Sequence, residues 1–329
     1  MIIVRTPYRI SLFGGGTDYP SWYKKNTGLT ISGSINHYSY IILKKLPRIF
    51  NYNYRIRYYK REEVKNINQI KHPVVREYLK LSKIHENIDI THHGDLPARS
   101  GIGSSSSFTV GLIHALETFK EKIPNKRELA IQAMNLEQKI LNESVGSQDQ
   151  VAAAFGGFNK IKFGGPQEFI CESFPISMKK LKILENWSLL IYTNKTRNSE
   201  KIEKIKINNL NKNFDLNCKI IEITNEAEKI FLKGKPNWIR EIGKLLDDYW
   251  FIKKKLSKNT SNNFVDNIYK IGKKNGAIGG KLLGAGGGGF MLLIAPPNKH
   301  KKILEKLTKF PVIKFRFEML GSQVIHKSY

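Results

Sequence analysis

Residues 97–107 constrain this chain more than any other stretch. The run reads Pro-Ala-Arg-Ser-Gly-Ile-Gly and continues with four serines. Two glycines one residue apart allow positive φ angles and remove the Cβ atoms that would block a close ligand. An apolar helical pattern follows over 108–120, so the run predicts a loop that leads into a helix N-terminus, a favourable place for an anion. We therefore expect a phosphate site rather than a flexible glycine–serine linker, which would not lie between an apolar strand and an amphipathic helix.

The length and composition are typical of a globular protein. The 329 residues suffice for two domains, and a hydrophobic content of 40% with 25% charged residues is ordinary. No apolar run is long enough to cross a bilayer, and the N-terminus lacks a signal-peptide pattern. Cys171 and Cys218 have no metal-ligand spacing and resemble reduced thiols, which favours a cytoplasmic location.

The net charge of +27 is the unusual feature of the composition. It fits an enzyme with anionic substrates or a nucleic-acid-binding protein. The lysines are scattered over predicted helix faces among many Asn and Ile residues, which also fits a bias in codon usage. A basic nucleic-acid-binding protein stays the alternative from another class, although the sequence lacks the RNA-binding motifs that combine aromatic and basic residues.

Hydrophobic spacing predicts an α+β fold with two domains, over residues 1–185 and 186–329. We expect strands over 2–13, 29–46, 53–60, 88–92, 158–163, 187–193, 290–295 and 312–317, and helices over 74–83, 108–120, 126–141, 199–208, 217–233, 236–257, 262–274 and 299–307, with a short helix from residue 151. Glycine turns are expected at 14–16 and within 279–289.

Three runs resemble motifs of the GHMP kinases and occur in the family's order. Residues 7–19 resemble the first motif, residues 97–105 the phosphate loop of the form P-x-x-x-G-x-G-S-S, and residues 281–289 the glycine-rich motif of the C-terminal domain. The resemblance covers nearly the whole chain. It implies a ribosomal-protein-S5-domain-2-like α/β domain followed by a ferredoxin-like α+β domain, and ATP-dependent phosphoryl transfer to an alcohol group.

Within this family, the residues at 5–11, 14–20, 145–154 and 279–290 most resemble the corresponding motifs of the bacterial kinases of D-glycero-D-manno-heptose 7-phosphate. That resemblance implies phosphorylation of O1, which would supply nucleotide-activated heptose for surface polysaccharide. Gly15 and Gly16 stand where galactokinases usually carry Glu-His, which makes galactose itself less expected. Another sugar, fucose-like or galactose-like, stays the alternative.

The resemblance also implies residues that bind ATP and Mg²⁺. The expected nucleotide ligands are Pro97, Ser100, Gly101, Ile102, Gly103, Ser104, Ser105, Ser106 and Ser107. Ser104 or Ser105 would hold Mg²⁺ together with Glu137, because Mg²⁺ prefers oxygen ligands. The structural alternatives are helix N-capping for the serines and a solvated helix face for Glu137.

For catalysis, we expect Asp149 to accept or orient the proton of the acceptor hydroxyl and Arg9 to lie against the transferring phosphoryl group or Asp149. His92 and His93, which have no third ligand nearby in sequence, are interpreted as structural. The expected substrate ligands are Asp18, Gly16, Thr17, Gly286 and Gly287 for the sugar, and Lys195 and Arg197 for a phosphate already on it. An exposed loop is the alternative for that last pair. The expected partners are a sugar or sugar phosphate and ATP, without a membrane or nucleic acid, in a monomer or homodimer.

Overall fold

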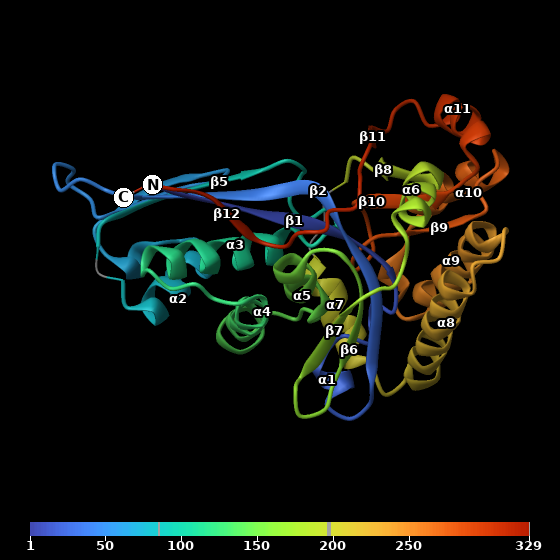
Figure 1. Cartoon of the computed structure of the whole chain (residues 1–329), viewed down its shortest axis with the longest axis horizontal. Coiled ribbons are helices and arrows are strands. Elements are labelled where there is room, and N and C mark those ends of the chain that lie inside the picture. The colour runs from blue at the N-terminus through green and yellow to red at the C-terminus, as the bar shows by residue number, and fades with distance from the viewer. Residues whose placement is uncertain (85, 196–198, 329) are drawn as a thin grey trace.

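The computed structural model describes residues 1–84, 86–195 and 199–328. Its elements form two sheets that lie toward opposite ends of an elongated molecule, each with its own helices (Figure 1). The expected α+β fold class is confirmed by this arrangement. In the described ranges, no helix combines the length and the apolar character needed to cross a membrane.

The large sheet has eight strands, in the order β12-β1-β2-β5-β3-β4, with β6 and β7 branching from β2. They are β1 (Ile2–Phe13), β2 (Gly28–Lys45), β3 (Tyr54–Arg57), β4 (Arg61–Val64), β5 (Ile88–Gly94), β6 (Phe158–Phe163), β7 (Phe169–Ser173) and β12 (Gln323–Lys327). The pairs are antiparallel except for β3 with β5. The long strand β2 joins the parts of the sheet, because its first half pairs with β6, its second half with β5, and both halves pair with β1.

Helices cover one face of the large sheet (Figure 1). The helical elements of this half are α1 (Pro20–Tyr23), the short 3-10 turn η1 (Ile67–Gln69), α2 (Pro73–Ser82), α3 (Ser104–Phe119), α4 (Lys126–Met134), η2 (Asn135–Ile140) and α5 (Gln148–Phe155). Helix α3 is the central one, since it packs against β1, β2 and α5, with Val110, Leu112 and Ile113 fully buried. Its N-terminus is therefore held in place by packing on several sides.

The second sheet has four antiparallel strands in the order β11-β8-β10-β9. These strands and the surrounding helices are α6 (Met178–Trp187), β8 (Ser188–Tyr192), α7 (Ser199–Asn208), α8 (Phe214–Lys233), α9 (Trp238–Lys255), η3 (Lys258–Thr260), α10 (Asn263–Lys274), β9 (Gly279–Leu282), β10 (Phe290–Ile294), α11 (Pro297–Lys306) and β11 (Val312–Ile313). Successive residues of β10 belong to two different cores, as the two-residue period of a strand requires. Leu292 packs with α8 and α9, and Met291 with α10 and α11.

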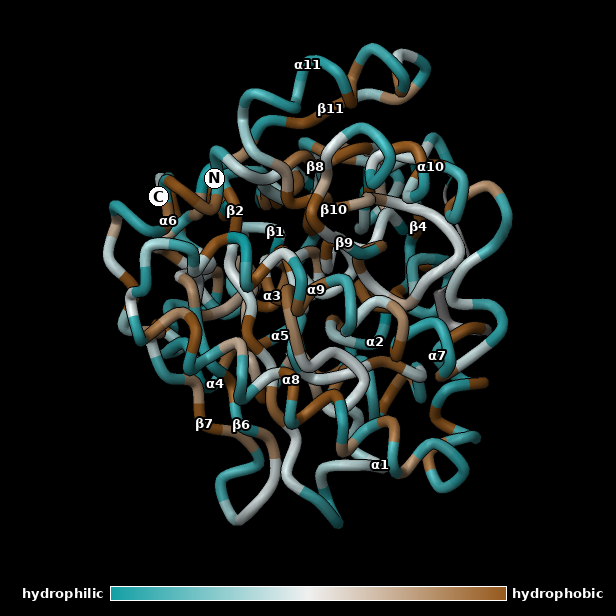
Figure 2. The backbone as a smooth tube through the Cα atoms, turned by 90° about the vertical axis from the view of Figure 1, so that its right-hand side faces the viewer, coloured by the Kyte–Doolittle hydropathy of each residue, from teal (hydrophilic) through white to brown (hydrophobic). Residues whose placement is uncertain are grey.

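The hydrophobic segments of this half gather at β8 and β10, inside a rim of hydrophilic turns (Figure 2). The core on the α8 and α9 side also contains Ile10, Leu12 and Ile31 from β1 and β2. One continuous apolar core thus joins the two sheets, and it holds the end of β1 against the second half of the chain.

The last strand was not expected from the sequence. β12 pairs with β1 at the edge of the large sheet, and the amino group of Met1 donates to the carbonyl of Ser328 at 2.8 Å. Three residues of β12 are exposed and its apolar alternation is weak, which explains why the pattern gave no signal. The end of the chain, β12, therefore returns to the first sheet. The division of the chain at residue 185 stays a prediction.

Three helix boundaries differ from the sequence prediction in ways that matter for the site. α3 begins at Ser104 instead of residue 108, because the serines form its first turn. The helix expected over 126–141 changes into a π-helix after Met134, and α5 begins at Gln148 instead of residue 151. Asp149 therefore lies in the first turn of a helix.

Candidate active site

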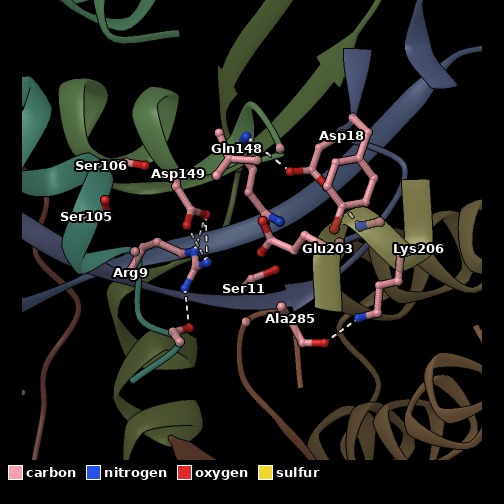
Figure 3. Close-up of a pocket in the computed structure, with 18 of the residues that line it drawn as sticks. Arg9, Ser11, Asp18, Ser105, Ser106, Gln148, Asp149, Glu203, Lys206 and Ala285 are labelled. Carbon is pink, nitrogen blue, oxygen red and sulfur yellow. Dashed lines mark hydrogen bonds and ion pairs between the residues drawn. The ribbon is translucent and has the colours of Figure 1, made fainter. Parts of the chain in front are cut away.

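A cavity of about 270 Å³ lies where the two halves of the chain meet (Figure 3). Its walls come from the end of β1 and the glycine turn after it, the loop before α3, the segment before α5, helices α7 and α9, and the loop after β9. The lining residues are Arg9, Ser11, Gly15, Gly16, Asp18, Tyr19, Arg99, Gly101, Gly103, Ser104, Ser105, Ser106, Glu143, Val145, Gly146, Gln148, Asp149, Glu203, Lys206, Lys253, Gly284 and Ala285.

An ion pair between Arg9 and Asp149 forms part of the cavity wall. The Nε and Nη2 atoms of Arg9 donate to Oδ1 and Oδ2 of Asp149, each at 2.8 Å. The third nitrogen, Nη1, donates to the carbonyl of Gly101 at 2.7 Å. Such two-pronged contacts fix a carboxylate in orientation as well as position. Arg9 is buried and the Asp149 side chain is 25% exposed. Both residues line the cavity, and the guanidinium holds the carboxylate in place there.

The glycines of the loop are required by its geometry. Gly101 and Gly103 have φ angles of 86° and 74°, a region that residues with a Cβ rarely adopt. A Cβ on Gly103 would lie 3.3 Å from Cγ of Arg9 and 3.4 Å from Oδ2 of Asp149. The N–H of Ser107 bonds to the carbonyl of Gly103 at 2.9 Å and begins the helical ladder. The preceding N–H groups of α3 lie ahead of that ladder, at the cavity, where they suit an anion.

The serines of the loop have different roles. Ser104, Ser105 and Ser106 line the cavity. Ser107 instead donates to the carbonyl of Pro7 at 2.8 Å, which ties α3 to β1. Ser100 donates to the carbonyl of Pro97 at 2.6 Å, inside the loop itself. Of the described residues that were expected to bind nucleotide, Pro97, Ser100, Ile102 and Ser107 therefore shape the loop rather than line the cavity.

Glu137 lies directly behind the serines, in the π-helix. Its side chain is buried, and its Oε2 accepts hydrogen bonds from Ser106 Oγ at 3.0 Å and from Gln150. Within the described residues its second oxygen, Oε1, has no hydrogen-bond partner. Burial, with the nearby charge of Glu143, raises the pKa of Glu137 to about 7. A buried carboxylate oxygen without a partner, beside a serine hydroxyl, fits a hard cation such as Mg²⁺.

That cation would need ligands beyond the protein's carboxylates. Across the described ranges, no group of three or more His, Cys, Asp and Glu side chains could hold a metal ion. The contact made by Glu137 is to Ser106, whereas the sequence favoured Ser104 or Ser105; Ser104 Oγ accepts from the N–H of Arg99 at 3.3 Å. A site completed by phosphate oxygens and water would agree with this donor set.

Asp18 lies across the cavity from the loop (Figure 3). It is buried, and it accepts from the backbone N–H of Gly16 at 2.8 Å and of Gln148 at 3.3 Å. Burial raises its pKa above the usual range, with a further contribution from the charge of Asp149. A Cβ at Gly146 would overlap the Asp18 carboxylate, so glycine is needed there. Thr17, also expected to bind sugar, donates to the carbonyl of Gly14 at 2.9 Å and holds the turn from inside.

The glycine turn is held from the second half of the chain. The hydroxyl of Tyr249 donates to the carbonyl of Gly15 at 2.9 Å. The buried ammonium of Lys281 donates to the carbonyls of Ser11 and Leu12 at 2.8 and 2.9 Å. It also lies 4.4 Å from the centre of the Tyr249 ring. Two polar side chains of α9 and β9 thus fix the end of β1 and the turn that presents Asp18.

Four residues expected at the substrate lie elsewhere or cannot be placed. Lys195 is exposed, its ammonium 4.2 Å from the centre of the Phe264 ring, and it is not among the described lining residues. Arg197 lies outside the described residues. Gly286 and Gly287 pack against the backbone of Thr260, with a 3.0 Å bond from the N–H of Gly287 to its carbonyl. They shape the loop after β9 and are not among the described residues that line the cavity.

Of the two histidines before the loop, His92 has the structural surroundings that were expected, whereas His93 is exposed and its role stays a prediction. His92 Nε2 is 3.0 Å from Ser39 Oγ, and its ring packs against Phe108 at 4.9 Å between centroids. Burial lowers the pKa of His92 to about 4. It is therefore an uncharged, half-buried residue at neutral pH.

Several lining residues were missed by sequence reasoning. Gly284 and Ala285 belong to a motif that was recognised but assigned to its later glycines. Glu203, Lys206 and Lys253 come from lysine-rich amphipathic helices that resemble ordinary surface helices in sequence. No local signal distinguishes these three, because only the packing of α7 and α9 turns them toward the cavity.

Comparisons with known proteins show the family of the chain. The family model for the GHMP kinases N terminal domain matches residues 68–157, and the model for the GHMP kinases C terminal region matches residues 235–313. The chain is 30% identical to the D-glycero-alpha-D-manno-heptose 7-phosphate kinase of Campylobacter jejuni, over 94% of this chain and 93% of that protein. It is 24% identical to the bifunctional fucokinase/GDP-fucose pyrophosphorylase of Arabidopsis thaliana, over 92% of this chain and 31% of that protein.

Solved structures share the fold. A D-glycero-D-manno-heptose 1-phosphate kinase from Bacteroides thetaiotaomicron superposes with a TM-score of 0.80 at 23% identity, over 100% of both chains. Lactococcus lactis galactokinase in complex with galactose superposes with a TM-score of 0.72 at 17% identity, over 98% of this chain and 95% of the other.

Proposed function

The chain belongs to the GHMP kinases and is an ATP-dependent phosphotransferase that acts on a sugar hydroxyl; from this premise we propose that it phosphorylates O1 of D-glycero-D-manno-heptose 7-phosphate. The observation that carries the proposal is the Arg9–Asp149 pair, fixed between the loop of α3 and the Asp18 side of one cavity. The likeness to the Campylobacter jejuni relative over nearly the full length of both chains supports the choice of sugar.

Asp149 is the group that receives the proton. Its carboxylate faces the cavity, and Arg9 orients both of its oxygens, so the acceptor hydroxyl can donate to it. As the hydroxyl oxygen bonds to the γ-phosphorus, the bond from that phosphorus to the bridging oxygen breaks and its electron pair leaves with ADP. The hydroxyl proton passes to Asp149 and from there to solvent. Arg9 places positive charge beside the transferring group while it holds the loop through Gly101.

The first turn of α3 is the phosphate-binding end of the cavity. Its N–H groups and the positive end of the helix dipole favour the triphosphate. Ser106 and Glu137 would hold Mg²⁺, which neutralises phosphate charge when bound. The packing of α3 between β1, β2 and α5 keeps these donors from moving during the reaction.

Asp18 and its turn form the acceptor end. A carboxylate with two backbone N–H partners stays anchored and can still accept hydrogen bonds from sugar hydroxyls. A 1,7-bisphosphate product would serve nucleotide-activated heptose synthesis. The use of ATP supports a cytoplasmic location as part of the proposal. A monomer or a homodimer is compatible with a cavity that one chain completes by itself.

The proposal is tested by measuring ADP formed from ATP with each of a panel of sugars as the acceptor. The panel contains D-glycero-D-manno-heptose with and without its 7-phosphate, D-mannose, L-fucose and D-galactose. We expect the highest kcat/KM for heptose 7-phosphate. A higher value for L-fucose or D-galactose would move the assignment to the function of the fucokinase and galactokinase relatives.

A further inference from the structure

Two lysines with buried side chains lie at the cavity without a role in the reaction so far described. Lys206 of α7 and Lys253 of α9 are each 4% exposed, and both line the cavity. Lysine is among the residues that are least often buried, because its charge loses hydration. A charged group kept at a concave, water-filled site commonly serves a ligand of opposite charge.

The loop after β9 brings these two ammonium groups together. Lys253 donates to the carbonyls of Leu282 and Gly284, at 3.2 and 2.6 Å, and Lys206 donates to the carbonyl of Ala285. Their acceptors thus lie within four consecutive residues of one loop. These hydrogen bonds to the carbonyls help to fix the position of both side chains.

Lys281 and Arg9 also lie near this part of the cavity. Lys281 bonds to the end of β1, before the glycine turn. Its pKa is lowered well under the usual range, chiefly by burial, and further by the positive charges of Arg9 and Lys206. Arg9 itself is engaged with Asp149. This end of the cavity thus combines the ammonium groups of Lys206 and Lys253, which suit an anion, with the carboxylates of Asp18 and Glu203, which suit hydroxyl groups. A sugar phosphate carries both kinds of group.

The pair lies at the acceptor end. Figure 3 shows Lys206 and Glu203 on the opposite side of the Arg9–Asp149 pair from Ser105 and Ser106. With a triphosphate at α3 and the reacting hydroxyl at Asp149, the far part of the acceptor extends toward α7 and α9. A phosphate remote from the reacting hydroxyl would reach these ammonium groups rather than the loop.

We propose that Lys206 and Lys253 bind the phosphate monoester that the acceptor sugar already carries, an inference that rests on the proposed function. The pair takes the place that the sequence gave to Lys195, whose side chain lies outside the cavity. Binding a remote phosphate anchors the sugar so that its other end is held at Asp149. The lysines thereby select phosphorylated over unphosphorylated acceptors.

Lys206→Met and Lys253→Met test the proposal. Each removes the ammonium but keeps a long side chain. A charge-assisted contact to phosphate is strong enough that its loss should lower kcat/KM for heptose 7-phosphate by about 10- to 150-fold. The value for unphosphorylated heptose should change less than about threefold, and KM for ATP should stay the same.

Exposed lysines on the same two helices give matched controls. Lys204→Met on α7 and Lys255→Met on α9 remove the same charge from outside the cavity and should behave as the wild type with both sugars. Equal losses on phosphorylated and unphosphorylated heptose would mean that the lysines only hold the loop after β9, and would overturn the proposal. A raised KM for ATP would overturn it as well, because the lysines would then serve the nucleotide.

A binding measurement separates this inference from the proposed function. Inorganic phosphate is titrated calorimetrically into enzyme saturated with Mg²⁺ and the non-hydrolysable analogue AMP-PNP, which occupies the nucleotide end. The wild type and both control variants should bind phosphate, and Lys206→Met and Lys253→Met should bind it at least about tenfold more weakly. This result would support the subsite even if the sugar panel rejected heptose 7-phosphate. Absence of binding to the wild type, or unchanged binding to the two variants, would overturn it.

Discussion

The two ends of the cavity are built in different ways. The nucleotide end comes from one continuous stretch, the loop and first turn of α3, backed by Glu137. The acceptor end is assembled from the turn after β1, the segment before α5, two helices of the second half and the loop after β9. Arg9 and Asp149 stand between them (Figure 3), and Arg9 bonds to the loop through the carbonyl of Gly101. The acceptor can therefore change through α7 and α9 while the phosphate loop stays intact, which suits one fold to many sugars.

The largest effect is expected where the two ends meet. Asp149→Asn keeps the shape of the side chain but removes the proton acceptor and weakens the hold on Arg9. We expect kcat to fall about 10³-fold, with the affinity for ATP within a few-fold of wild type. Steady-state ADP release and an ATP titration measure the two quantities. Asp248→Asn, on the exposed face of α9, is the control. Wild-type turnover in Asp149→Asn would exclude this residue as the base.

The next effect should be confined to the nucleotide end. Gly103→Val places a branched side chain at a φ of 74°, against Arg9 and Asp149, in the space of the phosphates. We expect Kd for ATP to rise by about 10- to 100-fold. Gly165→Val is a close match, because Gly165 has a φ of 76° and nothing within 4 Å of its added Cβ. It carries the same backbone strain without touching the site. Similar ATP affinities in the two folded variants would contradict the phosphate role of the loop.

The sequence predicts the nucleotide end of the site better than the acceptor end, because the first is one continuous stretch and the second is assembled from distant segments. The phosphate loop could be predicted because its glycines, its serines and the start of a helix are adjacent in the chain. The positive φ values of Gly101 and Gly103 confirm the predicted turn. Arg9 and Asp149 lie 140 positions apart, and only the family resemblance related them. Lys206 and Lys253 had no local signal at all, since their helices share the lysine-rich pattern of the whole chain.

The secondary structure shows the same difference between elements with a strong local pattern and elements that depend on distant contacts. Strongly periodic elements such as β1, β2 and α9 were predicted within a few residues. The short edge strand β12 is stabilised by pairing with β1, a contact that no local pattern encodes. The π-helix that carries Glu137 was expected as ordinary α-helix, because a change in hydrogen-bond register leaves the apolar spacing almost unaltered.

A smaller effect is expected from the support of the acceptor end. Lys281→Met removes the two hydrogen bonds that hold the carbonyls of Ser11 and Leu12, and so loosens the turn that presents Asp18. We expect KM for the sugar to rise about tenfold and KM for ATP to stay unchanged. Initial rates with each substrate varied in turn provide both constants. Lys274→Met, at an exposed position of α10, is the control. A parallel rise in KM for ATP would mean that Lys281 supports both ends.

The smallest effect concerns stability and the proton that Glu137 binds. Its pKa of about 7 lies above the value of an unfolded glutamate, so the folded protein binds this proton more tightly. The resulting stabilisation is complete below about pH 4.3 and is lost as pH rises through about 7. Without Mg²⁺, Tm should therefore fall between pH 5 and 8 by a few degrees more in the wild type than in Glu137→Gln. Identical pH profiles for the two proteins would show that Glu137 does not carry this proton.

The identity of the reaction product tests the central claim most directly. Heptose 7-phosphate and ATP are incubated with the enzyme, and the products are examined by phosphorus NMR. We predict ADP together with a heptose that keeps its 7-phosphate and gains a second phosphate whose phosphorus couples to the anomeric proton. A new phosphate on any other hydroxyl, or release of inorganic phosphate without a second sugar phosphate, would contradict the account.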